Sequence, residues 1–320
     1  MIITKDYNTS QEILQDGTGK NKRPWQSKKS RNLALSDSFK RLGDENKSSR
    51  TRSCAFTLAF LKNEETGRKT LKSAMFCQVR LCPMCQWRKS LKVFFQLSKV
   101  IDEVERRHKD LVPIFLTLTV RNCSADDLSG VLDNIFKGWY QFTKHRKTNR
   151  LAKGWFRALE ITYNTDENTF HPHIHVLLLV EKKYFKSKDY MHTTDWVQLW
   201  RTSAGLDYDP VCDVRKVKTS KGKYKAIAEI AKYTLKDSEI LTSDKQLTDK
   251  LVDVLSSALH RRRLFAYGGI LKKIAKELNA DDPDKGDLVH IDDDAVREDI
   301  ASLIEHYQWH FGVKNYVRSG

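Results

Sequence analysis

The segment HPHIHVLLLV, residues 171–180, alternates polar and apolar side chains and then becomes wholly apolar. Successive side chains of a β-strand point to opposite faces, so His173 and His175 share one face while Ile174 and Val176 share the other. Two imidazoles at this spacing can chelate one divalent ion, and such an ion would offset the cost of burying them among apolar neighbours. The alternative is that both histidines are solvated near the start of the strand.

The preceding segment WFRALEITYN, residues 155–164, predicts a second strand that contains one acidic side chain. A polar turn over residues 164–168 would fold the two strands into a hairpin and bring Glu160 opposite residues 171–173. A carboxylate beside the two histidines would leave coordination positions open for a substrate oxygen. Mg²⁺ or Mn²⁺ suits hard oxygen ligands of this kind. His171 could replace or join Glu160, and an ordinary surface ion pair of Glu160 is the competing interpretation.

The other periodic segments indicate a mixed fold. Residues 53–60, 113–120 and 213–218 have the pattern of strands, whereas apolar spacing near 3.6 marks helices at 91–107, 126–144, 194–203, 225–237 and beyond Leu241. The order strand, helix, hairpin, helix, strand, helix predicts an α+β domain with an antiparallel sheet.

The segment KAIAEIAKYTLKD, residues 225–237, predicts an amphipathic helix with an unusual polar stripe. Tyr233 follows Glu229 by one turn and precedes Lys236 by one turn, so the three side chains are neighbours on such a helix. Flanking ammonium groups favour the phenolate, which is a competent nucleophile toward phosphorus. Lys236 could bear charge that develops on phosphoryl oxygens, and Glu229 could act as a general base. An exposed amphipathic helix with ordinary ion pairs is the alternative.

The charge of the chain indicates a polyanionic partner. A net charge of +16 over 320 residues strengthens binding to phosphates through counterion release, although a merely soluble basic protein is the alternative. No apolar run approaches the roughly 20 residues of a membrane span, and the polar N-terminus lacks a signal core. We therefore expect a cytoplasmic protein with no membrane partner.

Four of the six cysteines predict a structural zinc site. Cys77, Cys82 and Cys85 have the spacing C-x₄-C-x₂-C, and Cys54 could complete a tetrahedral Cys₄ set for Zn²⁺. The alternative is reduced thiols in a core, the class to which we assign the remaining two, Cys123 and Cys212.

Basic residues next to the cysteines and the tyrosine predict DNA contacts. We expect phosphates to be bound by Arg80, Arg88, Lys89 and Lys232. Trp87 could pack against the cysteine cluster or stack on an exposed base.

Several segments together resemble the rolling-circle plasmid replication initiators (Rep proteins), members of the histidine–hydrophobe–histidine (HUH) endonuclease superfamily. The match is to the single-tyrosine branch with an upstream Cys-rich module. It rests on FLTLTV (115–120), LEITYN (159–164), HPHIHVLL (171–178) and EIAKYTLKDSE (229–239), in the order of the family. The one departure is Arg121, where proline is more usual.

This resemblance implies a fold and a mechanism. A ferredoxin-like antiparallel sheet with flanking helices would hold the catalytic ion through His173, His175 and Glu160. Tyr233 would cut one origin strand, which leaves a 5′-phosphotyrosyl link and a free 3′-hydroxyl, and Glu229 would activate water for termination. The implied partners are double- and single-stranded plasmid origin DNA, a host helicase and polymerase, and a second protomer.

The sequence predicts four regions. They are a basic, largely disordered arm (1–50), a Cys-rich zinc-binding module (51–98), the HUH endonuclease domain (99–240) and a helical C-terminal region (241–320). A non-catalytic zinc-containing DNA-binding regulator would explain the charge and the cysteines, but not the histidine strand and the tyrosine stripe. A relaxase or transposase would use the same chemistry in another process.

Overall fold

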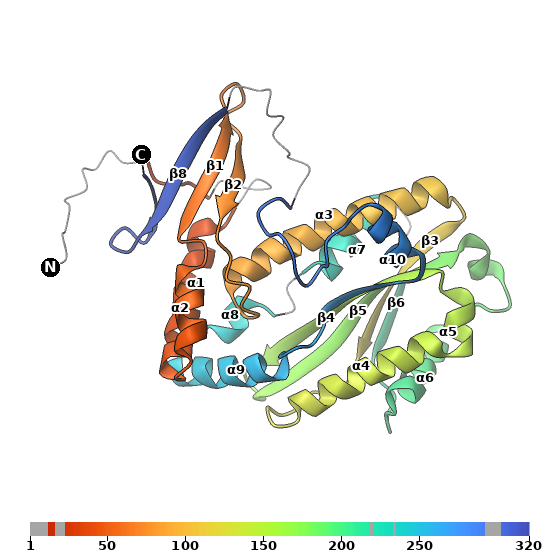
Figure 1. The fold of residues 1–320 in the computed structure, drawn as a ribbon. Coiled ribbons are helices and arrows are strands. Elements are labelled where there is room, and N and C mark those ends of the chain that lie inside the picture. The colour runs from red at the N-terminus through yellow and green to blue at the C-terminus, as the bar shows by residue number, and fades with distance from the viewer. Residues whose placement is uncertain (1–11, 17–22, 218–219, 233–234, 292–301, 320) are drawn as a thin grey trace. The chain divides into compact units, whose positions relative to one another are not determined.

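The computed structural model of the chain describes residues 12–16, 23–217, 220–232, 235–291 and 302–319 (Figure 1). The chain divides into two compact units. Unit 1 comprises residues 1–88 and 287–320, and unit 2 comprises residues 89–286.

Unit 2 is built on a five-stranded sheet in which every pair of neighbours is antiparallel. The strand order is β6-β3-β5-β4-β7. The strands are β3 (Leu111–Thr119), β4 (Gly154–Asn164), β5 (Thr169–Glu181), β6 (Cys212–Lys216) and β7 (Phe265–Gly268). The first four, with a helix after β3 and another after β5, follow the ferredoxin-like βαββαβ pattern, and β7 is added at the edge. The predicted α+β fold with an antiparallel sheet is confirmed.

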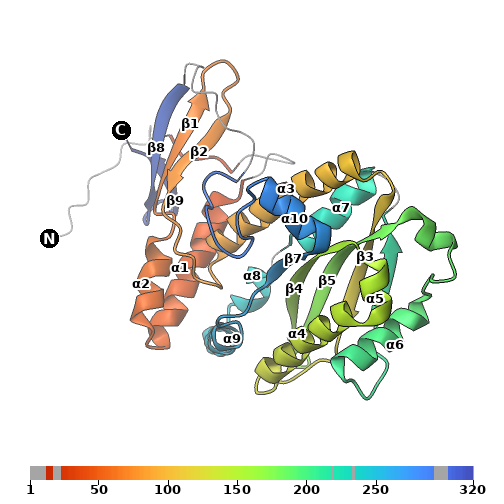
Figure 2. The ribbon, with the colours of Figure 1, turned by 45° about the vertical axis from the view of Figure 1, so that its right-hand side comes forward.

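Helices cover both faces of this sheet. They are α3 (Pro83–Arg107, which begins in unit 1), α4 (Leu128–Lys144), α5 (Arg146–Leu151), the 3₁₀ helix η2 (Lys182–Lys186), α6 (Thr193–Ala204), α7 (Ser220–Ile230), α8 (Asp237–Ile240), α9 (Lys245–Ala258) and α10 (Gly269–Glu277). Within unit 2, α4 and α6 lie on one side of the sheet while α3 and α7 lie on the other (Figures 1 and 2). The central strand β5 is therefore buried on both faces from Pro172 to Val180.

The β4–β5 hairpin sets the register of the histidine strand. Asn164 pairs with Thr169, and the Asn164 side chain accepts hydrogen bonds from the backbone of Asp166 and Glu167 in the turn. The turn ends at Asn168, which has a positive φ of 51°, a conformation that asparagine tolerates well. The predicted hairpin and its polar turn are thus present.

Unit 1 combines two helices with a second antiparallel sheet. The helices are α1 (Trp25–Arg41) and α2 (Glu45–Ser53), and the sheet has the order β2-β1-β8-β9. Its strands are β1 (Thr57–Asn63), β2 (Lys69–Ala74), β8 (Ser302–His310) and β9 (Asn315–Arg318). Large side chains buried in this unit include Trp25, Leu35, Phe39, Tyr307 and Tyr316.

Two expectations from the sequence are wrong. Residues 25–50, assigned to a disordered arm, lie largely in helices, because Trp25, Leu35 and Phe39 are apolar enough to be buried. Residues 1–11 and 17–22 of that arm lie outside the described residues. The C-terminal region contains the predicted helices but also three strands, and β8 pairs with β1 from the opposite end of the chain. This pairing places the C-terminus in the cysteine-containing unit, so the unit boundaries differ from the expected ones.

None of the helices in the described ranges is long and apolar enough to span a membrane.

Candidate active site

Glu160, His173 and His175 meet on one face of the unit 2 sheet. Glu160 of β4 pairs in register with His173 of β5, as the hairpin predicted. Its Oε2 lies 2.9 Å from Nε2 of His175 and 3.5 Å from Nε2 of His173. One ligand atom from each of the three residues fits within a span of 4.8 Å. Two imidazole nitrogens and one carboxylate oxygen at this spacing fit a divalent ion that keeps open positions for substrate.

The outer nitrogen of each imidazole is held by a hydrogen bond. Nδ1 of His175 lies 3.0 Å from Oγ1 of Thr117, which is its register partner on β3. Nδ1 of His173 lies 3.2 Å from the backbone carbonyl oxygen of His171. These contacts direct both Nε2 atoms toward Glu160, and such partners orient metal-ligating histidines in general. Sequence reasoning missed Thr117, although it stands in the strand segment FLTLTV.

The carboxylate of Glu160 is partly buried. Burial alone would raise the pKa of Glu160, but hydrogen bonds from His173 and His175 hold this pKa well below its usual range. The carboxylate is thus ionised at neutral pH, the form in which it can ligate a cation.

His171 lies beside this cluster and has another partner. Its Nδ1 is 2.8 Å from Oδ1 of Asn122, and its ring centroid is 5.3 Å from that of His173. Burial lowers the pKa of His171, and the nearby His173 lowers it further. Of the two candidates for the third ligand, the structure brings Glu160 into the cluster with both histidines.

The tyrosine segment departs from the predicted helix. The helix expected over 225–237 ends at Ile230, and the next helix, α8, begins at Asp237. In one continuous helix Ile230, Leu235 and Ile240 would be distributed around the whole helix axis, whereas a helix that ends at Ile230 allows all three to be buried. Tyr233 lies outside the described residues, so its predicted placement between Glu229 and Lys236 stays a prediction.

Glu229 lines a cavity next to the histidines. The cavity has a volume of about 410 Å³, and its walls include Phe115, Arg215 and Lys225. The Phe115 ring lies 5.4 Å from that of His175, so the cavity adjoins the metal-ligand cluster. Glu229 also forms an ion pair of 2.6 Å with Lys232.

Lys236 is electrostatically coupled to the same cluster. A hydrogen bond to Glu239 raises the pKa of Lys236, burial opposes this effect, and attraction to Glu160 and Glu229 adds to it. Lys236, three residues after Tyr233, is thus within electrostatic reach of both Glu160 and Glu229.

The four predicted zinc ligands come together in unit 1. The Sγ–Sγ distances are 3.6 Å for Cys54–Cys85 and 3.7 Å for both Cys77–Cys85 and Cys54–Cys82. Four sulfurs about 2.3 Å from a tetrahedral Zn²⁺ would lie about 3.8 Å apart, so the spacing fits zinc. The side-chain amide of Asn32 also donates to Cys82 Sγ over 3.1 Å, as expected beside a thiolate.

A buried lysine supports the cysteine cluster, and sequence reasoning did not single it out. Lys29 has no solvent exposure, and its Nζ donates to the carbonyl oxygens of Cys54 and Arg52 over 2.6 and 2.7 Å. Burial lowers the pKa of Lys29 to about 8, although the nearby thiols raise it. The other two thiols, Cys123 and Cys212, are buried apart from the cluster, and burial raises their pKa values to about 11 and about 12.

Two of the four predicted DNA contacts are not supported by the structure. The Arg88 guanidinium is buried and donates to the carbonyl oxygens of Leu288 and Val289 over 2.8 and 2.9 Å. Lys89 is also buried. Of the other two, Arg80 is partly exposed and Lys232 is exposed. Trp87 is 4% exposed and packs edge-on against Trp25, which favours its packing role over base stacking.

Comparison with known proteins identifies the family. A family profile described as replication protein matches residues 68–317. A Bacillus amyloliquefaciens protein named Protein rep is 40% identical over 333 residues, which cover 95% of this chain and 97% of that protein. Another Protein rep, from Streptococcus pneumoniae serotype 2, is 36% identical over 90% of each chain. A Staphylococcus aureus protein named Replication protein is 39% identical over 71% of this chain and 98% of its own length.

The chain belongs to the replication protein family. Its membership confirms the resemblance to plasmid replication initiators. The residues matched to the replication protein profile include Glu160, both histidines and three of the four clustered cysteines, whereas Cys54 precedes them. No solved structure matches the chain significantly.

Proposed function

We propose that this replication protein starts rolling-circle replication of a plasmid by nicking one strand of the origin DNA. The observation that carries the proposal is the cluster of Glu160, His173 and His175 within 4.8 Å on one face of a ferredoxin-like sheet. Mg²⁺ or Mn²⁺ is the ion proposed for this cluster, and Zn²⁺ for the four cysteines. When bound, the catalytic ion would polarise the scissile phosphate.

In this mechanism the phenolic oxygen of Tyr233 attacks the phosphorus of the scissile phosphodiester. A P–O(Tyr) bond forms and the P–O3′ bond breaks, so the protein carries the 5′ end of the strand while the 3′-hydroxyl is freed for a polymerase. Attraction to Glu160 helps to raise the pKa of Lys236. The Lys236 ammonium group would neutralise charge on the phosphoryl oxygens.

Termination would use water rather than a second tyrosine. Glu229 lines the cavity beside Phe115, where it can take a proton from water as that water breaks the P–O3′ bond of the regenerated origin site. The 3′-hydroxyl freed by this second cleavage would then attack the phosphotyrosyl phosphorus, which closes the displaced strand and releases Tyr233. A host helicase and a second protomer are the further partners proposed.

The decisive experiment uses supercoiled plasmid that carries the cognate origin. The protein is incubated with Mg²⁺ or Mn²⁺ and, in parallel, with EDTA, and nicked circles and covalent protein–DNA adducts are counted. We expect metal-dependent nicking that is lost in Tyr233→Phe while DNA affinity is kept. Tight binding without nicking in either metal would favour a non-catalytic regulator, and nicking that persists in Tyr233→Phe would reject this tyrosine as the nucleophile.

A further inference from the structure

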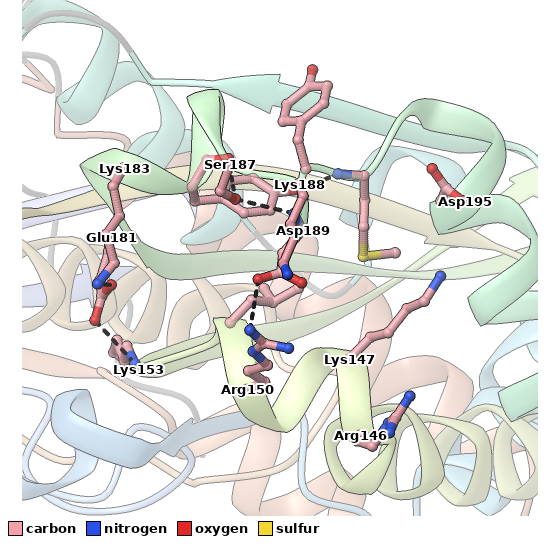
Figure 3. Close-up of a pocket in the computed structure, with 14 residues that line it drawn as sticks. Arg146, Lys147, Arg150, Lys153, Glu181, Lys183, Ser187, Lys188, Asp189 and Asp195 are labelled. Atoms are coloured by element: carbon pink, nitrogen blue, oxygen red, sulfur yellow. Dashed lines mark hydrogen bonds and ion pairs between the residues drawn. The ribbon is translucent and has the colours of Figure 1, made fainter.

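A second cavity in unit 2 is lined mainly by basic side chains. It has a volume of about 590 Å³ and lies between α5 and the loop that follows β5 (Figure 3). In Figure 3, Arg146, Lys147 and Arg150 rise from α5 toward the loop that carries Lys188 and Asp189. None of these residues belongs to the candidate active site.

The cavity carries an excess of positive charge. Six basic side chains line it, namely Arg146, Lys147, Arg150, Lys153, Lys183 and Lys188, against three acidic ones. Two of the acidic side chains pair within the wall, since Asp189 lies 3.0 Å from Arg150 and Glu181 lies 3.1 and 2.8 Å from Lys153 and Lys183. Arg146, Lys147 and Lys188 are all exposed. Three cationic side chains are thus available to an anionic ligand.

An exposed aromatic ring, that of Tyr190, lines the same cavity. Tyr190 is 43% exposed, and its ring is backed by the buried Tyr184 at 5.5 Å and by His192 at 5.1 Å. The loop that presents Tyr190 is tied down, because the Tyr184 hydroxyl accepts a hydrogen bond from the Met191 backbone over 3.1 Å. The backbone N–H of Tyr190 donates to the carbonyl oxygen of Ser187 over 3.1 Å. An exposed ring in a cavity lined by cationic side chains is the combination that binds unpaired bases together with their phosphates.

The position of the cavity relates it to the active site. Glu181, in the cavity wall, lies six residues beyond His175 on the same strand, β5. At about 3.4 Å per residue, this separation is about 20 Å. A single DNA strand bound at the histidines would need about six stacked nucleotides, at about 3.4 Å each, to reach the cavity.

We infer that this cavity binds single-stranded DNA at a point several nucleotides from the scissile phosphate. Arg146, Lys147 and Lys188 contact phosphates, and Tyr190 stacks on one unpaired base. The inference rests on the proposed function, to which it adds a separate site for the unwound strand. Stacking requires an unpaired base, so the aromatic contribution distinguishes single-stranded from duplex DNA.

The test measures equilibrium binding of the full-length chain to fluorescein-labelled oligothymidylate of about 20 nucleotides, long enough to span the cavity. A duplex of the same length is measured in parallel, and no divalent ion is added, so that binding does not depend on cleavage. The cavity variant combines three substitutions, Arg146→Ala, Lys147→Ala and Lys188→Ala. It should weaken single-strand binding at least tenfold at low salt. It should also reduce the slope of log affinity against log salt by about 2, since each phosphate contact on a single strand contributes about 0.7.

Tyr190→Leu separates stacking from charge. Leucine keeps an apolar contact with Tyr184 but removes the aromatic face, so we expect roughly fivefold or greater weakening with the single strand and no change with the duplex. The matched control for the ring is Tyr140→Leu on α4, where the tyrosine is 58% exposed.

The matched control for charge removes three exposed lysines from α10 of the same unit, as Lys272→Ala, Lys273→Ala and Lys276→Ala. A companion variant with Arg146→Lys, Lys147→Arg and Lys188→Arg keeps the charge and should keep wild-type binding, which distinguishes lost charge from lost folding. Equal affinity of the cavity variant and the α10 control would overturn the inference. So would equal loss of single-strand and duplex binding in Tyr190→Leu.

Failure of the proposed function would be visible separately. If the wild-type chain nicks no origin DNA but the cavity variants still lose single-strand affinity, the nicking proposal fails and the binding site stands. If nicking is as proposed and the cavity variants bind like their controls, only this inference fails.

Discussion

Thr117 shows how a single hydroxyl can orient a candidate metal ligand. It lies on β3, opposite His175, and engages the imidazole nitrogen that faces away from Glu160. Partners of this kind fix the tautomer and the orientation of a ligating histidine, and they raise its basicity. A threonine in an alternating strand gives no such signal until the neighbouring strand is placed.

We expect Thr117→Val to weaken binding of Mn²⁺ by about 10- to 100-fold, because the His175 ring loses the partner of its Nδ1. Isothermal titration of the purified chain with Mn²⁺ would measure the change. Thr119→Val is the matched control, since its hydroxyl donates to the backbone carbonyl of Val211 instead of a histidine. An unchanged affinity in Thr117→Val would contradict the role assigned to this hydroxyl.

Arg88 illustrates the reverse case, a basic residue whose charge faces inward. Besides its two carbonyl acceptors, the guanidinium lies 5.5 Å from the ring centroid of Trp25 and 5.6 Å from that of Trp87. Its role in the structure is to join the segment at Leu288 and Val289 to the start of α3.

Arg88→Ala should therefore destabilise the fold by about 2–4 kcal/mol, because buried carbonyl groups lose a charged donor. Denaturant unfolding monitored by tryptophan fluorescence would report it. Arg106→Ala, which removes an exposed arginine from the same helix, should leave the unfolding midpoint nearly unchanged. A variant that folds normally but binds origin DNA weakly would restore the original prediction of a DNA contact.

The end of α7 determines where Glu229 lies. The helix ends at Ile230, one residue after Glu229, and the carboxylate lines the cavity that Phe115 and Arg215 also form. Phe115 also contacts the His175 ring, so this cavity and the metal-ligand cluster have Phe115 as a common neighbour.

In Glu229→Gln we expect the first nick to persist while hydrolytic cleavage of the second origin site slows by about 100-fold or more, the usual contribution of a general base. The measurement is the first-order decay of the covalent protein–DNA adduct after an uncut origin oligonucleotide is added as the second site. Glu277→Gln is the control. Glu277 is an exposed helical glutamate that, like Glu229, forms an ion pair with a basic side chain, in this case Arg107. Adduct decay at the wild-type rate would assign termination to another group.

The division into two units separates the two metal-ligand clusters. All four clustered cysteines lie in unit 1, whereas Glu160 and the two histidines lie in unit 2. Structural zinc contributes directly to folding free energy, so its loss should act first on the unit that contains it.

Cys82→Ser should lower the zinc content of the protein and abolish hydrogen-exchange protection in β1 and β8 while the β3–β5 ladder stays protected. Metal analysis and hydrogen-exchange mass spectrometry would show both effects. Cys212→Ser provides the control, because this buried thiol lies in unit 2 outside the cluster. Full protection of unit 1 in a zinc-free Cys82→Ser protein would reject a structural role for the metal.

Features that depend on short-range periodicity could be predicted from the amino-acid sequence. Alternation over residues 155–180 specified the β4–β5 hairpin, and a two-residue period leaves little freedom in which side chains share a face. For this reason Glu160, His173 and His175 could be grouped before the structure was known. The cysteine spacing likewise predicted the Cys₄ cluster, and the ordered motifs predicted the family.

The distant segments that cover each surface became evident from the three-dimensional fold. The pairing of β8 with β1, the burial of Arg88 against residues 200 positions away and the end of α7 at Ile230 all depend on partners remote in sequence. Local sequence patterns show that a face is apolar or that a side chain is charged. They do not show which distant segment packs against that face and buries its apolar surface. The basic character of Arg88 was therefore visible in the sequence, whereas its inward orientation was not.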